Sequence, residues 1–133
     1  MYKVTKEIRF CYGHRLRNYD GKCKHIHGHN GRVEIELESE SLDERGMVYD
    51  FSEIKEKVKE WIDDELDHSM LLREDDPLVE TFEELGEPYY TLEKNPTAEA
   101  IAEEIYSYTE SEGFPVTRVK LWETETSFAT YTG

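Results

Sequence analysis

The stretch Val33-Glu34-Ile35-Glu36-Leu37-Glu38 alternates apolar and acidic residues without a break. A period of two is typical of a strand with one buried face and one solvated face. Between Tyr2 and Phe10 the even positions are mostly apolar and the odd positions mostly polar, which predicts a second strand. Residues 12–26 are rich in Gly, Asn, Asp and Lys and are expected to form a long loop. We therefore expect a hairpin whose connection carries the chemically active residues.

Two amphipathic helices are predicted after this hairpin. Asp50 followed by Glu53 matches a capping box, and a helix is expected over residues 51–66. Asn95 or Thr97 caps a second helix, which a glycine and a proline end before residue 116. The apolar stripe of the first helix consists of Phe51, Ile54, Val58, Trp61, Ile62 and Leu66. The stripe of the second consists of Ile101, Ala102, Ile105 and Tyr108.

Two more strands are predicted near the C-terminus, over residues 116–123 and 127–131. The acidic stretch 73–94 separates the two long helices, and a short helix is expected in it around residues 78–85. The resulting order β-β-α-α-β-β predicts one α+β domain over residues 1–133, with two helices on one face of a four-stranded antiparallel sheet. Such a sheet leaves two edges open, so we expect an oligomer.

The chain carries a net charge of −15, which argues against non-specific binding to nucleic acid or to an anionic membrane. Residues 1–32, in contrast, hold eight Lys or Arg and only two acids. Arg15, Arg17, Lys22 and Lys24 therefore surround the segment that is richest in histidine. They favour an anionic ligand such as a phosphate ester, although they could instead offset the acidic remainder of the chain.

Two cysteines, Cys11 and Cys23, do not make a disulfide framework, so a reducing cytoplasm with free thiols is the expectation. The first residues contain no continuous apolar segment, and no stretch reaches the roughly 20 apolar residues of a membrane span. We therefore expect neither a signal peptide nor a membrane anchor.

The segment Cys23-Lys24-His25-Ile26-His27-Gly28-His29 predicts a metal site. If it is extended, its three histidines share a face, but the first and last lie about 13 Å apart. One zinc ion therefore cannot bind all three, and the expected pair is His27 and His29, with Gly28 letting the backbone bend. A third ligand must come from elsewhere, either His14 or His68. Three histidines and an open position suit a catalytic zinc, whereas Cys23 as a fourth ligand would close a structural one.

Other residues near this pattern have two interpretations each. Cys23 could be a thiolate base or nucleophile rather than a ligand. His68 follows Asp67 at the end of a predicted helix, so the pair is either a surface cap or a proton relay. Glu123 lies on the apolar face of a predicted strand and needs a partner, either an internal ion pair or a planar ligand that donates two N–H groups.

The ordered pattern of motifs resembles the 6-pyruvoyltetrahydropterin synthase / 6-carboxytetrahydropterin synthase family. The likeness covers nearly the whole chain. The matching pieces are His14-Arg15-Leu16, Cys23-x-x-x-His27-Gly28-His29, Asp50-Phe51, Leu66-Asp67-His68, Asn95-Pro96-Thr97 and Glu123-Thr124. The resemblance implies the tunnelling fold (T-fold), in which subunits form trimeric β-barrels that stack into a homohexamer, with active sites between subunits.

The resemblance also implies a cofactor and roles for individual residues. It assigns His14, His27 and His29 to Zn²⁺, Cys23, Asp67 and His68 to catalysis, and Glu123 and Thr97 to substrate binding. Cys23 is then the general base, and Asp67 and His68 complete the proton relay. Glu123 binds the 2-amino-4-oxo edge of a pterin.

The implied substrate is 7,8-dihydroneopterin triphosphate, whose triphosphate would meet the basic loop. The motif spacing is closest to the branch that makes 6-carboxy-5,6,7,8-tetrahydropterin, acetaldehyde and triphosphate on the route to 7-deazaguanine nucleosides such as queuosine. A synthase that makes 6-pyruvoyltetrahydropterin and a non-catalytic zinc-stabilised pterin-binding protein are the alternatives. Phe10-Cys11-Tyr12-Gly13-His14 departs from the family pattern Phe-x-Ala-Ala-His, and Cys11 is expected to be a small buried residue without a role.

Overall fold

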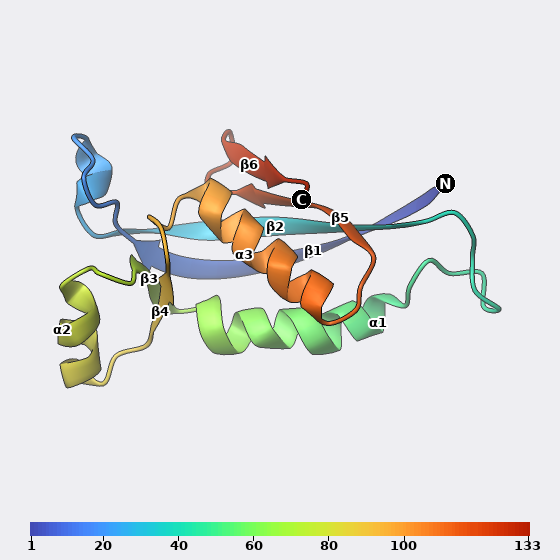
Figure 1. Ribbon diagram of the computed structural model, residues 1–133, viewed down its shortest axis with the longest axis horizontal. Helices are drawn as coiled ribbons and strands as arrows, with labels where there is room; N and C mark the ends of the chain where they lie inside the picture. The colour runs from blue at the N-terminus through green and yellow to red at the C-terminus, as the bar shows by residue number, and fades with distance from the viewer.

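A computed structural model describes all residues 1–133 as one six-stranded sheet with helices on one face (Figure 1). The strand order is β4-β3-β1-β2-β5-β6. The strands span β1 (Tyr2–His14), β2 (His27–Ser39), β3 (Ser69–Arg73), β4 (Tyr89–Leu92), β5 (Val116–Trp122) and β6 (Phe128–Tyr131). The α+β class and the predicted long hairpin are confirmed. The structure contains no helix of the length and apolar character that a membrane span requires.

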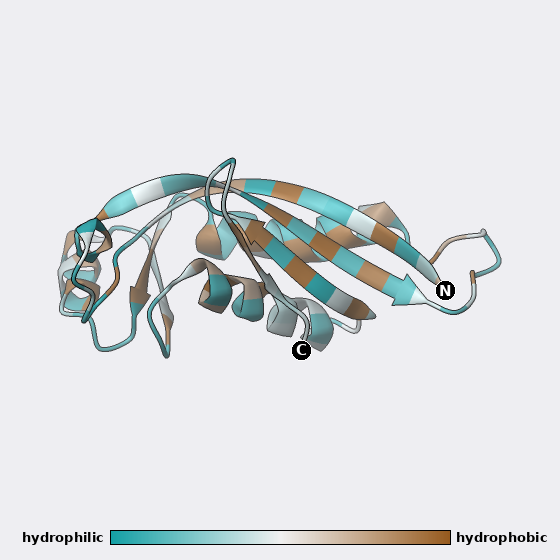
Figure 2. Cartoon of the chain, turned by 90° about the horizontal axis from the view of Figure 1, so that it is seen from above, coloured by the Kyte–Doolittle hydropathy of each residue, from teal (hydrophilic) through white to brown (hydrophobic).

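The hairpin of β1 and β2 is longer than expected, because its paired residues run from Tyr2 and Ser39 to His14 and His27. Alternate residues of β2 pack inward, and Val33, Ile35 and Leu37 are fully buried. Figure 2 shows this alternation as bands of opposite hydropathy along the long strands, above the helices. The expected loop 12–26 is thus shorter, and both of its ends carry a histidine in a paired strand.

The first helical layer begins at α1 (Phe51–Ile54) and continues through two π-helical segments, η2 (Lys55–Lys59) and η3 (Ile62–Leu66). Asp50 caps it by accepting a hydrogen bond from Ser52 N at 2.9 Å. The predicted cap is thus confirmed, but its side-chain partner is Ser52 and not the Glu53 of a capping box. Ile54, Val58, Ile62 and Leu66 are buried against the sheet. Phe51 was wrongly assigned to this stripe. It is exposed because it begins the helix, beyond the edge of the core.

The second long helix, α3 (Ala98–Ser111), packs on β5 and β6 beside the first. Ile101, Ala102 and Ile105 are buried, as expected. Tyr108, in contrast, remains half-buried and stacks on the similarly half-buried Trp61, with ring centroids 4.2 Å apart. The two helices therefore join through an aromatic contact near the surface as well as through the core.

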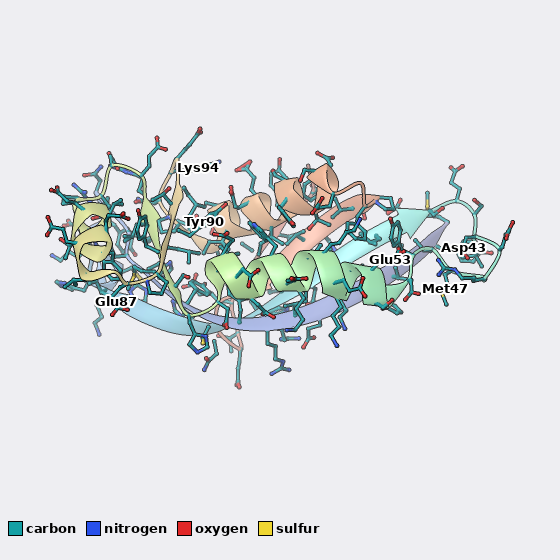
Figure 3. The ribbon with its side chains drawn as sticks, turned by 90° about the horizontal axis from the view of Figure 1, so that it is seen from below. Asp43, Met47, Glu53, Glu87, Tyr90 and Lys94 are labelled. Carbon is teal, nitrogen blue, oxygen red and sulfur yellow. The ribbon has the colours of Figure 1, made fainter.

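Residues 69–94 differ most from the predicted architecture. The short helix α2 (Leu78–Leu85) was expected, but β3 and β4 were not. They extend the sheet beyond β1 with parallel pairing, so the sheet is mixed rather than four-stranded and antiparallel. These elements gather at the end of the hairpin that carries the histidines (Figure 1). Figure 3 places Glu87 at this end, and Asp43 and Met47 in the loop at the opposite end.

Candidate functional site

Three of the predicted site residues meet where β1 ends and β2 begins. His14 lies opposite His27 in the strand register, and His29 follows two residues later on the same face. The three rings have centroids 4.5 to 5.1 Å apart. Their nitrogens form one of two potential ligand clusters in the chain, with the ligand atoms within 4.8 Å of one another. His25 is outside the cluster, as its distance along the strand predicted.

Backbone carbonyls hold two of the imidazole rings so that their Nε2 atoms remain free. His14 Nδ1 donates to Pro96 O at 2.6 Å, and His27 Nδ1 donates to His25 O at 2.7 Å. The Nε2 atoms of His14, His27 and His29 are buried without a hydrogen-bond partner. Three orphaned ring nitrogens fit the donor set of zinc, whose histidine ligands commonly donate their other N–H to a carbonyl. The site therefore matches a three-histidine metal centre with an open position.

Burial keeps these rings in the form that binds metal. Removal from water lowers the pKa of His14, and the charge of His27 lowers it further, against the opposing effect of the Pro96 carbonyl. Burial also lowers the pKa of His29, although Glu123 raises it. Both rings are therefore neutral near pH 7, and no proton competes with a metal for their Nε2 atoms.

Gly28 has a different role from the one its position suggested. It lies in a regular strand opposite Gly13 and does not bend the backbone. A Cβ atom at Gly28 would lie 3.1 Å from the carbonyl oxygen of Tyr12, closer than an ordinary van der Waals contact. The absence of a side chain thus lets β1 and β2 approach each other between His27 and His29.

Glu123 follows β5 and reaches this cluster from the neighbouring strand. Its Oε1 atom is 3.1 Å from His29 Nε2, at ion-pair distance but without hydrogen-bond geometry. Burial and the nearby Glu123 charge both raise the pKa of Tyr12, whose hydroxyl is buried without a partner. A metal on His29 Nε2 would leave the Glu123 carboxylate without this neighbour and available to a ligand donor.

The segment Asn95-Pro96-Thr97 supports the cluster from the start of α3. Thr97 is the helix cap, because its hydroxyl oxygen accepts from Ala100 N at 3.1 Å. The Asn95 side chain instead accepts a hydrogen bond from Arg17 N at 2.9 Å and donates one to Arg17 O at 2.7 Å. The Pro96 carbonyl between them orients His14. Thr97 is therefore next in the chain to a residue that contacts His14, but its own side chain does not line the cleft beside His27 and His29.

Asp67 and His68 form the second cluster, together with Cys11. His68 Nδ1 lies 2.7 Å from Asp67 Oδ2, and Cys11 N donates to Asp67 Oδ1 at 2.9 Å. Burial would raise the pKa of Asp67, but the hydrogen bond from Cys11 and the contact with His68 outweigh it and lower the pKa. His68 has a φ of 59° and donates its N–H to Cys11 O at 2.7 Å. The pair is thus a fixed Asp-His dyad rather than a loose surface cap.

Cys11 and Cys23 do not occupy the expected places. Cys11 is half-buried and lies against the dyad, with Sγ 3.6 Å from the His68 ring nitrogens. Cys23 lies in the short helix η1 (Lys22–Lys24) and belongs to neither ligand cluster. Within one chain, the structure therefore brings Cys11, and not Cys23, together with Asp67 and His68. Only the departure from the family pattern at Cys11 could have indicated this from the sequence.

A cleft of about 630 Å³ is lined by residues of both clusters. They are His27 and His29 of the first cluster and Cys11 and His68 of the second. Phe82, Glu87 and Pro88 close it from the segment that contains α2. The acidic stretch that had no assigned function in the sequence is therefore a wall of the candidate site.

Asp76 was missed by the sequence analysis and organises the basic loop. Its buried carboxylate accepts two hydrogen bonds from Arg15, one of them from Nε at 2.8 Å, and one from Leu78 N at 2.8 Å. Burial would raise its pKa, but these donors outweigh burial and lower it. Arg17 lies farther away, at 3.9 Å. Arg15 thus offsets an internal acid, as one sequence interpretation proposed, while Lys22 and Lys24 remain exposed.

Comparison with known proteins identifies the family. The family model described as 6-pyruvoyl tetrahydropterin synthase matches residues 3–133. The 6-carboxy-5,6,7,8-tetrahydropterin synthase of Rickettsia bellii is 40% identical over 96% of this chain and 98% of its own length. The synthase of the same name from Haemophilus influenzae is 32% identical over 98% and 99%.

Solved structures agree with this assignment. An uncharacterised protein of Wolinella succinogenes superposes with a TM-score of 0.82 at 31% identity, over 99% of this chain and 98% of that one. The 6-pyruvoyl tetrahydropterin synthase of Caenorhabditis elegans gives a TM-score of 0.75 at 26% identity, over 99% and 95%. The T-fold predicted from the sequence is thus confirmed, and the chain belongs to the 6-pyruvoyl tetrahydropterin synthase family.

Proposed function

We propose that this protein is a Zn²⁺-dependent lyase that converts 7,8-dihydroneopterin triphosphate and water into 6-carboxy-5,6,7,8-tetrahydropterin, acetaldehyde and triphosphate. The observation that carries the proposal is the set of three buried Nε2 atoms without partners, beside a cleft that is also lined by His68 of the Asp-His dyad. The names of the curated relatives, at 32 to 40% identity, favour the 6-carboxy product. Such a product would feed 7-deazaguanine synthesis of the queuosine type, in the cytoplasm.

His14, His27 and His29 hold the metal in this proposal. A zinc ion bound there supplies Lewis acidity to an oxygen of the substrate side chain and acidifies the neighbouring C–H groups. Glu123 accepts hydrogen bonds from the 2-amino-4-oxo edge of the pterin, a planar pair of donors that suits a carboxylate. Thr97 stays in the proposal as a residue near that edge, because its O–H is still free to donate while its oxygen caps α3.

Proton transfer is assigned to Cys23, Asp67 and His68. Asp67 fixes the orientation of the His68 ring through the 2.7 Å contact, and the exposed side of that ring faces the cleft. Cys23 is the base that removes the activated proton. Because Cys23 and the dyad are not together within one chain, we propose that they meet across a subunit boundary in a homohexamer of two stacked trimeric barrels.

The triphosphate is assigned to the basic loop. Arg15 is already paired with Asp76, so the free charges are those of Lys22, Lys24 and, in part, Arg17. The Arg17 Nη1 atom is buried without a hydrogen-bond partner and can donate to a phosphate oxygen. The acidic remainder of the chain makes this loop the natural place for an anion.

Product analysis tests the proposal. The zinc-loaded protein is incubated anaerobically with 7,8-dihydroneopterin triphosphate, and the products are separated and identified by mass. Carboxytetrahydropterin with acetaldehyde supports the proposal. Formation of 6-pyruvoyltetrahydropterin, which needs triphosphate elimination but no added water, would assign the chain to the other activity of its family. No turnover at all would favour a non-catalytic pterin-binding protein.

Two variants separate the metal from the base. H27A removes a ligand and should lose both zinc and activity. C23A should retain stoichiometric zinc but lose nearly all turnover, because the metal ligands are intact and only the base is absent. Full zinc content in H27A would contradict the metal assignment, and full activity in C23A would contradict the role of Cys23.

A further inference from the structure

The second ligand cluster contains a thiol, a carboxylate and an imidazole at distances that suit a metal. Cys11 Sγ lies 3.6 Å from the His68 ring nitrogens and 3.7 Å from Asp67 Oδ1. In a tetrahedral zinc site with Zn–S near 2.3 Å and Zn–N or Zn–O near 2.0–2.2 Å, sulfur lies roughly 3.5–3.6 Å from the other ligand atoms. The observed separations from sulfur are therefore close to those of a zinc site.

We propose that Cys11, Asp67 and His68 form a second metal site, selective for Zn²⁺ and similar soft divalent cations. Thiolate and imidazole ligands favour zinc, whereas magnesium and calcium prefer oxygen ligands alone. Three ligands leave a fourth position for water, and the cleft gives access to it.

The backbone holds this cluster in place before any metal binds. Cys11 donates its N–H to Asp67 Oδ1, and Cys11 O accepts the N–H of His68. The His68 side chain is 78% exposed, so a metal ion can reach its ring from solvent. Asp67 Oδ2 meets His68 Nδ1, the arrangement in which a carboxylate orients a ligating histidine through its second ring nitrogen.

This site is separate from the three-histidine centre. Side chains alternate along β1, so Cys11 points to the face of the sheet opposite Tyr12 and His14. The two clusters share no residue. A sulfur ligand is present in the second cluster and absent from the first, and this difference gives the two sites distinct spectra.

The site has a regulatory consequence, which rests on the proposed function. A cation held by Asp67 and His68 occupies the lone pairs that proton transfer requires. Zinc beyond the first equivalent should therefore inhibit turnover, and C11S should relieve the inhibition because it loses the sulfur ligand while Asp67 and His68 remain.

Cobalt titration tests the site without any substrate. Co²⁺ replaces Zn²⁺ in tetrahedral sites and shows a sulfur-to-metal charge-transfer absorption only with a thiolate ligand. The metal-free, reduced assembly is titrated with Co²⁺ as wild type, C11S, C23S and H27A. We expect the absorption in wild type, C23S and H27A and its loss in C11S, which should still bind one cobalt ion at the histidines.

Other outcomes would overturn the proposal. They are an absorption that persists in C11S, one that disappears in C23S, or none in the wild type. H68N is a second variant that does not depend on the fold of C11S, because Asn tolerates the positive φ of this residue. By removing a ligand, it should raise the Co²⁺ concentration that gives half of the maximal thiolate absorption at least about tenfold. A protein that binds cobalt in this way but shows no turnover would refute the proposed reaction and leave the metal site standing.

Discussion

The Arg15–Asp76 pair should make a measurable contribution to stability, which D76N removes. The Asp76 side chain is fully buried, while that of Arg15 is 24% exposed. Removing one partner of a buried ion pair costs about 3–5 kcal/mol, because the other charge is left unpaired. Arg15 regains some hydration, and Asn keeps one acceptor oxygen for Leu78 N. We therefore expect D76N to lower the free energy of unfolding by about 2–3 kcal/mol.

Urea unfolding of the metal-free protein measures this change, at one fixed protein concentration because the protein is expected to oligomerise. R15Q and the double variant complete a double-mutant cycle. The expected coupling energy between the two positions is about 1–3 kcal/mol, as for residues in direct contact. A free energy of unfolding of D76N within about 0.5 kcal/mol of wild type would refute this account of the pair, and so would additive effects in the double variant.

Three further predictions concern the same end of the hairpin. G28A should be less stable than G13A by about 1–2 kcal/mol, because its new methyl group lies 3.1 Å from the Tyr12 carbonyl oxygen. The methyl group of G13A lies close to the flexible end of Met70 and only at ordinary contact distance, 3.5 Å, from a backbone oxygen. Urea unfolding compares the two variants, and equal stabilities would contradict the close-approach argument. Y12F should leave the metal-free protein as stable as wild type or up to about 1 kcal/mol more stable, since it removes a buried hydroxyl without a partner; a clear loss in thermal unfolding would show that the hydroxyl is satisfied. The pKa of Asp76 is lower in the folded protein than its ordinary value of 3.8. Its contribution to the free energy of unfolding is therefore complete at pH values above 3.8 and declines as the pH falls through the folded pKa, because the unfolded carboxyl binds a proton first. The free energies of unfolding of wild type and D76N, measured as the pH is lowered, should therefore converge at low pH. A difference that stays constant with pH would contradict the assignment.

The parts of the fold that repeat a pattern could be predicted from the sequence. The alternation in Val33–Glu38 located the core of β2, and helical spacing located the stripe from Ile54 to Leu66. β3 and β4 were missed because they are short and pair in parallel beside β1, with no clear period of two in their burial. A strand of this kind depends on the neighbour that receives it, which local sequence does not reveal.

In the candidate site, too, the features that depend on local sequence patterns could be predicted, whereas the contacts between distant residues could not. The spacing of His27 and His29 sufficed to place both on one strand face, and the resemblance supplied His14 as the third ligand, which the structure places beside them. The contacts of Cys11 with Asp67 and of Arg15 with Asp76 join residues 56 and 61 positions apart, so no local pattern indicates them. The role of Gly28 also required the structure, since only the distance to a backbone oxygen on the opposite strand explains it.

The three residues before α3 carry different tasks in consecutive positions. Asn95 ties down the basic loop, Pro96 orients His14 through its carbonyl, and Thr97 starts the helix. An insertion or deletion of a single residue here would displace the loop, the His14 ring and the helix together. The structure therefore tolerates substitutions in this segment that preserve each task, but it does not tolerate a shift of the segment by one position along the chain.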